Sequence, residues 1–289
     1  MAFPSQPSNQ KWCASLAKMV QNRRKLGPFI VFGLALVFTA TGRLIEAEEP
    51  PSGEDHEFEE LGLNRFTAPS ISQIFNQLDQ LKPLPFDQLK REPPRVAGAT
   101  REQKALIFGE LIADGFLLVE AEKKNLVDNF GRVLIDHARA LGVSDRVIRH
   151  SASLTELGKR GDWPRMRQEL VTTQTDVEQA MLDLRDQKMA HLISLGGWLR
   201  GLEICAATVE ADFSPKRAAI LARPDLANYF ATELKTLPPA VEAASLFEKI
   251  RLGINALHPL LNKTTLSRAD VAAIRTRASD LNNLIRQGQ

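Results

Sequence analysis

The chain has 289 residues, of which 37 are Lys or Arg and 35 are Asp or Glu, so its formal net charge is +2. This balance excludes a polyanion binder that relies on bulk charge, and nucleic acid is therefore not an expected partner. Two cysteines exclude a disulfide scaffold and a zinc site made of cysteines. An aromatic content of 6% argues against a stacking surface for single strands or sugars.

Charge is distributed unevenly along the chain. Residues 1–47 hold six basic residues and one acidic residue, a net charge of +5. Residues 48–60 carry −7 without a Lys or Arg, and residues 61–289 carry +4. The net charge of +2 is therefore the sum of three segments of different character, and each segment needs its own interpretation.

The first segment, residues 1–47, has the layout of a secretory signal. The basic group Arg23–Arg24–Lys25 precedes an apolar run from Phe29 to Ala40, and small residues follow that run. A membrane span needs about 20 apolar residues, and the shorter run here favours a cleaved signal. A signal-anchor through residues 27–42 and an ordinary buried helix are the alternatives. The sequence thus predicts export, to the periplasm or out of the cell.

Residues 48–66 are predicted to form an acidic, disordered linker, because they contain too little apolar surface to offset the entropy lost on ordering. Residues 67–99 are predicted to hold short helices and a Pro-rich connector, the first helix beginning at a capping box of Ser70 and Gln73. Four prolines interrupt this second stretch: Pro83, Pro85, Pro93 and Pro94.

Residues 100–289 are predicted to form an all-α domain, either a multi-helix bundle or an irregular helical array. No sheet is expected, because no run alternates apolar and polar residues between hairpin turns. Helices are expected at about 100–122, 126–141, 153–160, 163–187, 189–209, 225–236, 240–257 and 268–286. Capping residues support three of these helix starts, at Thr100, Ser153 and Ser267, and Ser214 followed by Pro215 marks a further helix start. Gly142 is expected at the C-terminal cap of the second helix.

The helix expected at 163–187 has the clearest period. Its seam recurs at alternating spacings of three and four residues: Trp163, Met166, Leu170, Thr173, Val177, Ala180 and Leu184. This spacing is typical of a helix that packs along an antiparallel partner.

The segment from Met189 to Val209 is apolar nearly all round, which predicts a buried central helix. Gly197, Gly201 and Cys205 recur every four residues and predict a stripe that admits another helix backbone closely. Two glycines inside a helix cost about 1 kcal/mol each relative to Ala, which suggests a packing reason for them.

No motif for nucleotide binding, metal binding or nucleophilic catalysis is present, so the sequence assigns no catalytic residue, cofactor or metal. What it offers is polar residues on apolar helix surfaces: Glu110, Asp114, His137, Arg200 and Glu203. Arg200 and Glu203 predict a buried ion pair, or alternatively an anchor for an anionic ligand. Glu110 and Asp114 are interpreted as solvated or paired carboxylates, with a divalent cation or a shared proton as the alternative.

Three histidine and tryptophan side chains complete the candidates. His137 lies on the apolar face of its helix and is interpreted as a hydrogen-bonded core histidine, with a metal ligand or general base as the alternative. His191 and Trp198 are seven residues apart on one helix face and are candidates for the lining of a pocket.

These observations favour an exported, all-helical, non-enzymatic binding or interaction module of the cell envelope. Its expected partner is an unidentified protein or envelope component, with membrane contact only through the N-terminal segment. One alternative is an enzyme, such as a metal-dependent hydrolase that uses the buried carboxylates and His137. The other is a helical carrier of a small apolar ligand.

Overall fold

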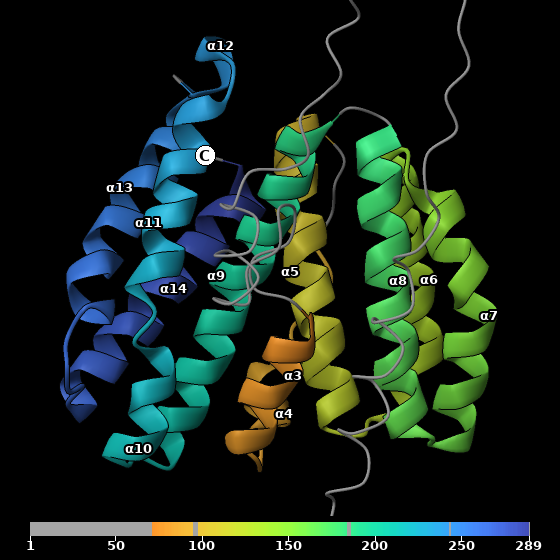
Figure 1. Cartoon of the computed structure of the whole chain (residues 1–289), viewed down its shortest axis with the longest axis horizontal. Helices are drawn as coiled ribbons and strands as arrows, with labels where there is room; N and C mark the ends of the chain where they lie inside the picture. Colours follow the sequence, from red (N-terminus) through yellow and green to blue (C-terminus); the bar gives the residue numbers. More distant parts are fainter. Residues whose placement is uncertain (1–70, 95–97, 184–185, 243, 289) are drawn as a thin grey trace, which may run out of the picture. The chain divides into compact units, whose positions relative to one another are not determined.

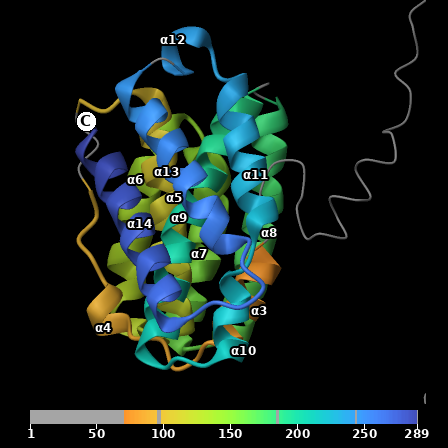
Figure 2. The ribbon, with the colours of Figure 1, turned by 90° about the vertical axis from the view of Figure 1, so that its left-hand side faces the viewer.

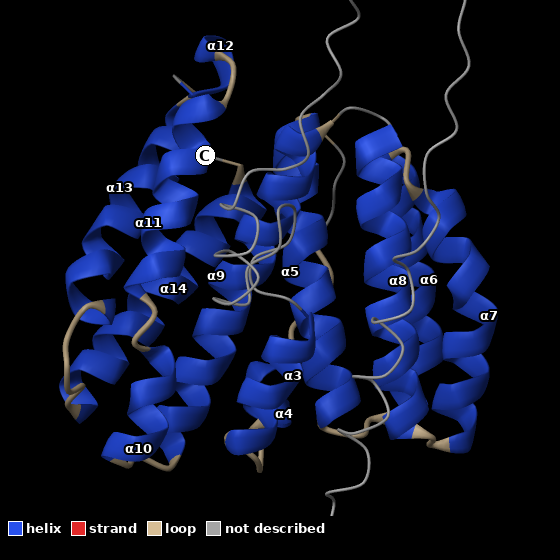
Figure 3. Cartoon of the chain, viewed as in Figure 1, coloured by secondary structure: helices blue, strands red, loops and turns tan. Residues whose placement is uncertain are grey.

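The computed structural model describes residues 71–94, 98–183, 186–242 and 244–288, which belong to one compact unit. Every regular element in these ranges is a helix, so the all-α prediction is confirmed (Figures 1 and 3). The predicted signal, the acidic linker and the Ser70 end of the first capping box lie outside the described residues.

The elements follow one another in this order: α3 (Ile71–Gln80), α4 (Phe86–Leu89), α5 (Arg101–Glu120), η1 (Lys124–Leu126), α6 (Val127–Leu141), α7 (Ser144–Arg160), α8 (Trp163–Asp183), α9 (Gln187–Ala211), α10 (Pro215–Ala218), η2 (Ala219–Leu221), α11 (Pro224–Glu233), η3 (Leu234–Thr236), α12 (Pro239–Glu242), α13 (Ser245–Leu261) and α14 (Arg268–Gln287).

Helix α9 is the buried central helix that the sequence predicts, with most of its 25 residues in the core. It is long and apolar enough to cross a membrane by length and composition, and 78% of its most apolar window is buried within the unit. Such burial is what the core helix of a globular unit requires. Helix α5 is its main neighbour and is likewise buried along most of its length.

Glycines bring the backbones of α5 and α9 together. A Cβ atom added at Gly109 would overlap the carbonyl oxygen of Ile193, and one added at Gly196 would overlap that of Leu106. Gly197 adjoins this crossing, where an added Cβ would lie 3.4 Å from the carbonyl oxygen of Gly109. The two helices therefore approach as closely as bare backbone allows.

The close approach differs in register from the expected stripe. An added Cβ at Gly201 meets no atom within 4 Å, and Cys205 is buried one turn further along the helix. The side of α9 that meets α5 carries Gly196, and the second glycine of the crossing, Gly109, belongs to α5. Of the two glycines in the stripe, only Gly197 adjoins the backbone of α5.

Two groups of helices flank the α5–α9 pair. On one side α14 packs along α9, and α13 packs on both α11 and α14, as Figure 2 shows from that side. On the other side α6 packs on α5, α7 on α6, and α8 on α7 (Figure 1). The short helices α3 and α4 bring Phe75, Leu81 and Phe86 into the same core, so residues 71–94 belong to the helical body.

Several predicted caps are present. The Thr100 hydroxyl accepts from the backbone N–H of Gln103, and Ser214 accepts from that of Arg217. Ser267 and Asp270 form a complete capping box. The side-chain amide of Gln103 donates to the carbonyl of Ile285, 2.8 Å away, and so ties α5 to α14. Gly142 ends α6 with φ of 81°, which is the left-handed conformation expected of it.

Two predicted helix boundaries are corrected. Helix α7 begins at Ser144, so Ser153 lies inside it and caps nothing. The expected helix at 240–257 is divided into α12 and α13, and α13 continues to Leu261 through Pro259. A proline removes one backbone hydrogen bond, and here the final turn continues despite that loss. The seam of α8 is visible at Met166 and Leu170, whereas the side chains of Val177 and Leu184 are outside the description.

Substitution of Gly196 tests the helix crossing. We expect Gly196→Ala to lower the free energy of unfolding of the full chain by about 2 kcal/mol or more, because the new methyl group meets backbone that has little room to move. The matched control is Gly201→Ala, which should raise it by about 0.5–1 kcal/mol through helix propensity. Urea denaturation measures both, and equal effects at the two glycines would contradict the crossing.

Candidate functional site

Four of the five candidate polar residues meet between α5 and α9. Arg200 donates to Asp114 Oδ1 at 2.6 Å and to Glu203 Oε2 at 2.8 Å. Its remaining nitrogen donates to the carbonyl oxygen of Leu89 at 2.5 Å. Arg200 is only 1% exposed, and a guanidinium buried this deeply is tolerated only when such partners compensate its lost hydration.

Two residues that sequence reasoning missed complete this network. Arg91, which follows α4, donates to Glu110 Oε2 at 2.8 Å and to Asp114 Oδ2 at 3.0 Å. Asn282 on α14 donates to Glu203 Oε2 at 2.7 Å. No periodicity marks either residue, since Arg91 lies in the Pro-rich connector and Asn282 on a mixed helix. The network joins α5 and α9 to the connector and to α14.

Glu110 is a fully buried and incompletely hydrogen-bonded member of the network. It is 1% exposed, and its Oε1 atom has no hydrogen-bond partner among the described residues. Burial raises the pKa of Glu110 to about 8, against the opposing influence of Arg91. Arg200 and Glu203 behave differently. Against the effect of burial, Asp114 and Glu203 together raise the pKa of Arg200, and Arg200 lowers that of Glu203.

His137 does not join the network. Its ring nitrogens lie 2.9 Å from the carbonyl oxygen of Val133 and 3.3 Å from that of Pro94. These contacts are those of a core histidine that fastens the connector to α6. The five candidates therefore do not converge in one catalytic constellation.

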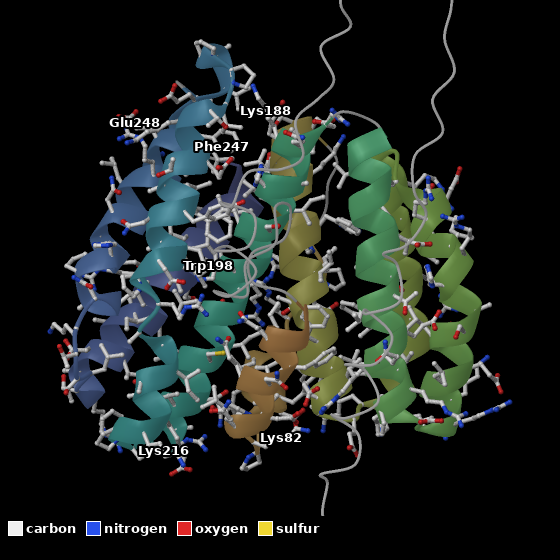
Figure 4. The ribbon with its side chains drawn as sticks, viewed as in Figure 1. Lys82, Lys188, Trp198, Lys216, Phe247 and Glu248 are labelled. Carbon is white, nitrogen blue, oxygen red and sulfur yellow. The ribbon has the colours of Figure 1, made fainter. Side chains whose placement is uncertain are left out.

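His191 and Trp198 occupy separate surroundings. The Tyr229 hydroxyl lies 2.6 Å from His191 Nδ1, and Glu233 approaches the other ring nitrogen at 3.4 Å. Burial lowers the pKa of His191, with Glu233 acting against it. Trp198, which Figure 4 labels, belongs to α9. Its ring stacks on that of Phe230 with ring centroids 5.0 Å apart. A cavity of about 10 Å³ borders His191 but not Trp198, and that is room for about one water molecule.

In the described ranges, neither a reactive thiolate at Cys205 nor a cluster of metal-binding side chains is found. Burial raises the pKa of the Cys205 thiol to about 12, so the nucleophilic thiolate is scarce at neutral pH. Among the residues that the structure describes, no group of three or more His, Cys, Asp or Glu side chains is placed to hold a metal ion.

A second buried carboxylate, Glu120, was also missed by sequence reasoning. Lys82 and Arg167 approach its Oε2 atom at 2.8 Å and 2.5 Å, and both also pair with Asp79. Glu120 is the last residue of α5 and follows a run of apolar residues. That position in the sequence is the signal that would have identified it as buried. Its two cationic partners make it a link between α3, α5 and α8.

The largest departure from the sequence prediction is an apolar cavity of about 410 Å³ among α5, α6, α7 and α8. Aromatic and aliphatic side chains from all four helices form most of its wall: Phe108, Ile112, Phe116, Leu118, Val119, Val127, Phe130, Leu134, Ile135, Val147, Leu154, Met166 and Leu170. Several of them, including Phe130, Leu134 and Leu154, are only partly buried. The cavity therefore reaches the protein surface along α6 and α7.

A few polar side chains interrupt the apolar wall of this cavity: Asp128, Arg132, Ser151, Thr155, Lys159 and Thr173. Ser151 and Thr173 donate their hydroxyl protons to carbonyl oxygens of their own helices, at 2.7 Å in each case. Lys159 approaches Asp128 at 3.8 Å. A mostly apolar hollow of this volume with a few polar groups has the composition of a small-molecule site.

Comparison with known proteins gives no guidance: no family model, no curated protein and no solved structure matches the chain. The geometry alone therefore identifies the cavity as the candidate binding site. The Arg200 network is a set of hydrogen-bonded charged side chains, and none of its members lines this cavity or the small one beside His191.

The raised pKa of Glu110 predicts a pH dependence of stability. Its ordinary pKa is 4.5, so between about pH 4.5 and 8 the unfolded chain ionises this group while the folded chain keeps it protonated. The stabilisation from Glu110 is thus full below pH 4.5 and is lost as the pH rises through 8. We expect the difference in free energy of unfolding between wild type and Glu110→Gln to fall across this window.

Chemical denaturation at a series of pH values measures that difference. Glu248→Gln, the same substitution at an exposed position on α13, is the control and is measured over the same series of pH values. A difference for Glu110→Gln that rises with pH would mean that Arg91 holds Glu110 ionised in the folded chain.

Proposed function

We propose that this chain is a non-enzymatic binding protein whose helical body carries a small apolar ligand in the cavity among α5, α6, α7 and α8. The single observation that carries the proposal is the cavity itself, with its volume of about 410 Å³ and its wall of aromatic and aliphatic side chains. Ligand sites of this kind are commonly found between the helices of a bundle.

Energetics support an occupant for the cavity. Protein interiors are close-packed, and voids larger than a water molecule are few. Scaled from cavities left by truncated core side chains, a sealed empty volume of this size would cost on the order of 10 kcal/mol, and the cost is smaller here because the cavity reaches the surface and admits water. That figure is comparable with the whole stability of a domain. A ligand that fills the space and covers the partly exposed Phe130 and Leu134 removes much of this cost.

The polar network favours a binding role over an enzymatic one. A catalytic carboxylate must reach a substrate, whereas Asp114 and Glu203 accept hydrogen bonds from Arg200 inside the α5–α9 contact. Arg91 and Asn282 occupy further acceptor positions on the same carboxylates. These pairings support a structural role for the residues that the enzymatic alternative requires.

Export is the second element of the proposal and rests on the N-terminal sequence. An apolar compound that must cross an aqueous compartment needs a carrier, and this fits a body preceded by a signal-like leader and an acidic segment. We expect material recovered from the envelope or the medium to begin near Arg43 or Glu48, as N-terminal sequencing would show. An intact Met1 in membrane material would favour an anchor, and full-length chain confined to the cytoplasm would contradict export.

Filling the cavity tests the carrier. Gly131 lies in its wall on α6, and an added Cβ there meets no atom within 4 Å. We expect the full chain to enhance the fluorescence of a neutral apolar probe such as N-phenyl-1-naphthylamine. Gly131→Leu should weaken probe binding at least about tenfold, while its side chain raises the free energy of unfolding by about 1 kcal/mol.

The matched control is Gly201→Leu. It makes the same change at another helical glycine with open space beside it, but outside the cavity. Neither variant alters the apolar leader, so any binding of the probe to the leader is the same in both. Unchanged probe affinity in Gly201→Leu together with loss in Gly131→Leu supports the carrier. Equal affinity in both variants and wild type would show that the probe binds elsewhere, and the proposal would fail.

A further inference from the structure

We propose that the ligand is a single-chain anionic amphiphile, a long-chain fatty acid, with its carboxylate at Arg132 and Lys159 and its chain inside the apolar cavity. This inference rests on the proposed carrier function and specifies the chemistry of its ligand. It is carried by the grouping of the polar side chains in the cavity wall.

The cationic side chains lie together at one end of the cavity. Asp128 and Arg132 are one turn apart near the start of α6, and Lys159, in the last turn of α7, approaches Asp128 at 3.8 Å. Residues four apart in a helix share a face, so Arg132 stands beside this pair. Two cations and one anion leave a net charge of +1 at this end, which suits one carboxylate.

Arg132 is available to a ligand. Its side chain is exposed, and within the described residues it makes no hydrogen bond or ion pair. A guanidinium presents paired N–H donors that match the two oxygens of a carboxylate. The hydroxyl of Thr155, one turn before Lys159 on α7, also lies in the cavity wall and makes no hydrogen bond to described residues. It adds a neutral donor beside the charged ones.

The remaining wall suits a chain rather than a compact ring system. It extends along α5 from Phe108 to Val119 and along α7 from Val147 to Lys159, which at 1.5 Å per residue is roughly 17 Å of helix. Away from the cationic end, the polar members Ser151 and Thr173 have their hydroxyl protons engaged by backbone carbonyls. An elongated apolar body with one anionic end satisfies both the length and the charge of this site.

Competition experiments test the chemical class. Hexadecanoate and hexadecanol have equal chain lengths and differ at the head, so each is used below its aggregation concentration to displace the neutral probe from the full chain. We expect wild type to prefer the acid about tenfold, the scale of two partly exposed charge-assisted contacts. The double variant Arg132→Gln/Lys159→Gln should lose this preference and retain probe binding.

The matched control is Arg139→Gln/Arg160→Gln, which removes the same charges from exposed positions on the same two helices outside the cavity wall. It should keep the wild-type preference. Equal displacement by acid and alcohol in wild type would overturn the ligand class and leave the carrier intact. A preference that survives in the Arg132/Lys159 variant would overturn the assigned head site, and wild type that binds no probe would overturn the carrier itself.

Discussion

The contact of α5 with α9 through Gly109 and Gly196 is the constraint on which the rest of the body depends. Each glycine removes the Cβ that would strike a carbonyl of the opposite helix, so the two backbones meet directly. Arg200 and Asp114 follow a short way along both helices, and their 2.6 Å contact joins them. The crossing thereby determines where the buried charges lie.

The buried charges extend that constraint to the surrounding segments. Arg91 brings the connector onto α5, Asn282 brings α14 onto α9, and Gln103 links α5 to α14. A charge without its partner is far more costly in such a core than the pair is favourable. The network consequently specifies one arrangement of these segments more than it adds to stability.

The sequence predicts local features well because their causes are local. The cap at Ser267, the left-handed end at Gly142 and the apolar circumference of α9 each depend on a few neighbouring residues. The false start at Ser153 fails for the same reason: a capping pattern has no effect inside a helix that tertiary packing has already extended from Ser144. The five polar candidates illustrate the limit of this approach. Four of them share a network and His137 does not, and helical spacing alone does not separate them.

The cavity is invisible in the sequence because it is a property of four helices together. In the sequence, Phe130, Leu134 and Leu154 have the pattern of ordinary core residues. Only the packing of α5, α6, α7 and α8 together leaves a space among them. The two sides of α5 therefore differ. On one side its backbone touches that of α9, and on the other the side chains of α5, α6, α7 and α8 leave a cavity. Regions of low contact density are where proteins accommodate ligands and motion. Because α5 is packed backbone to backbone on α9, its side of the cavity offers the proposed ligand a wall with little room to move.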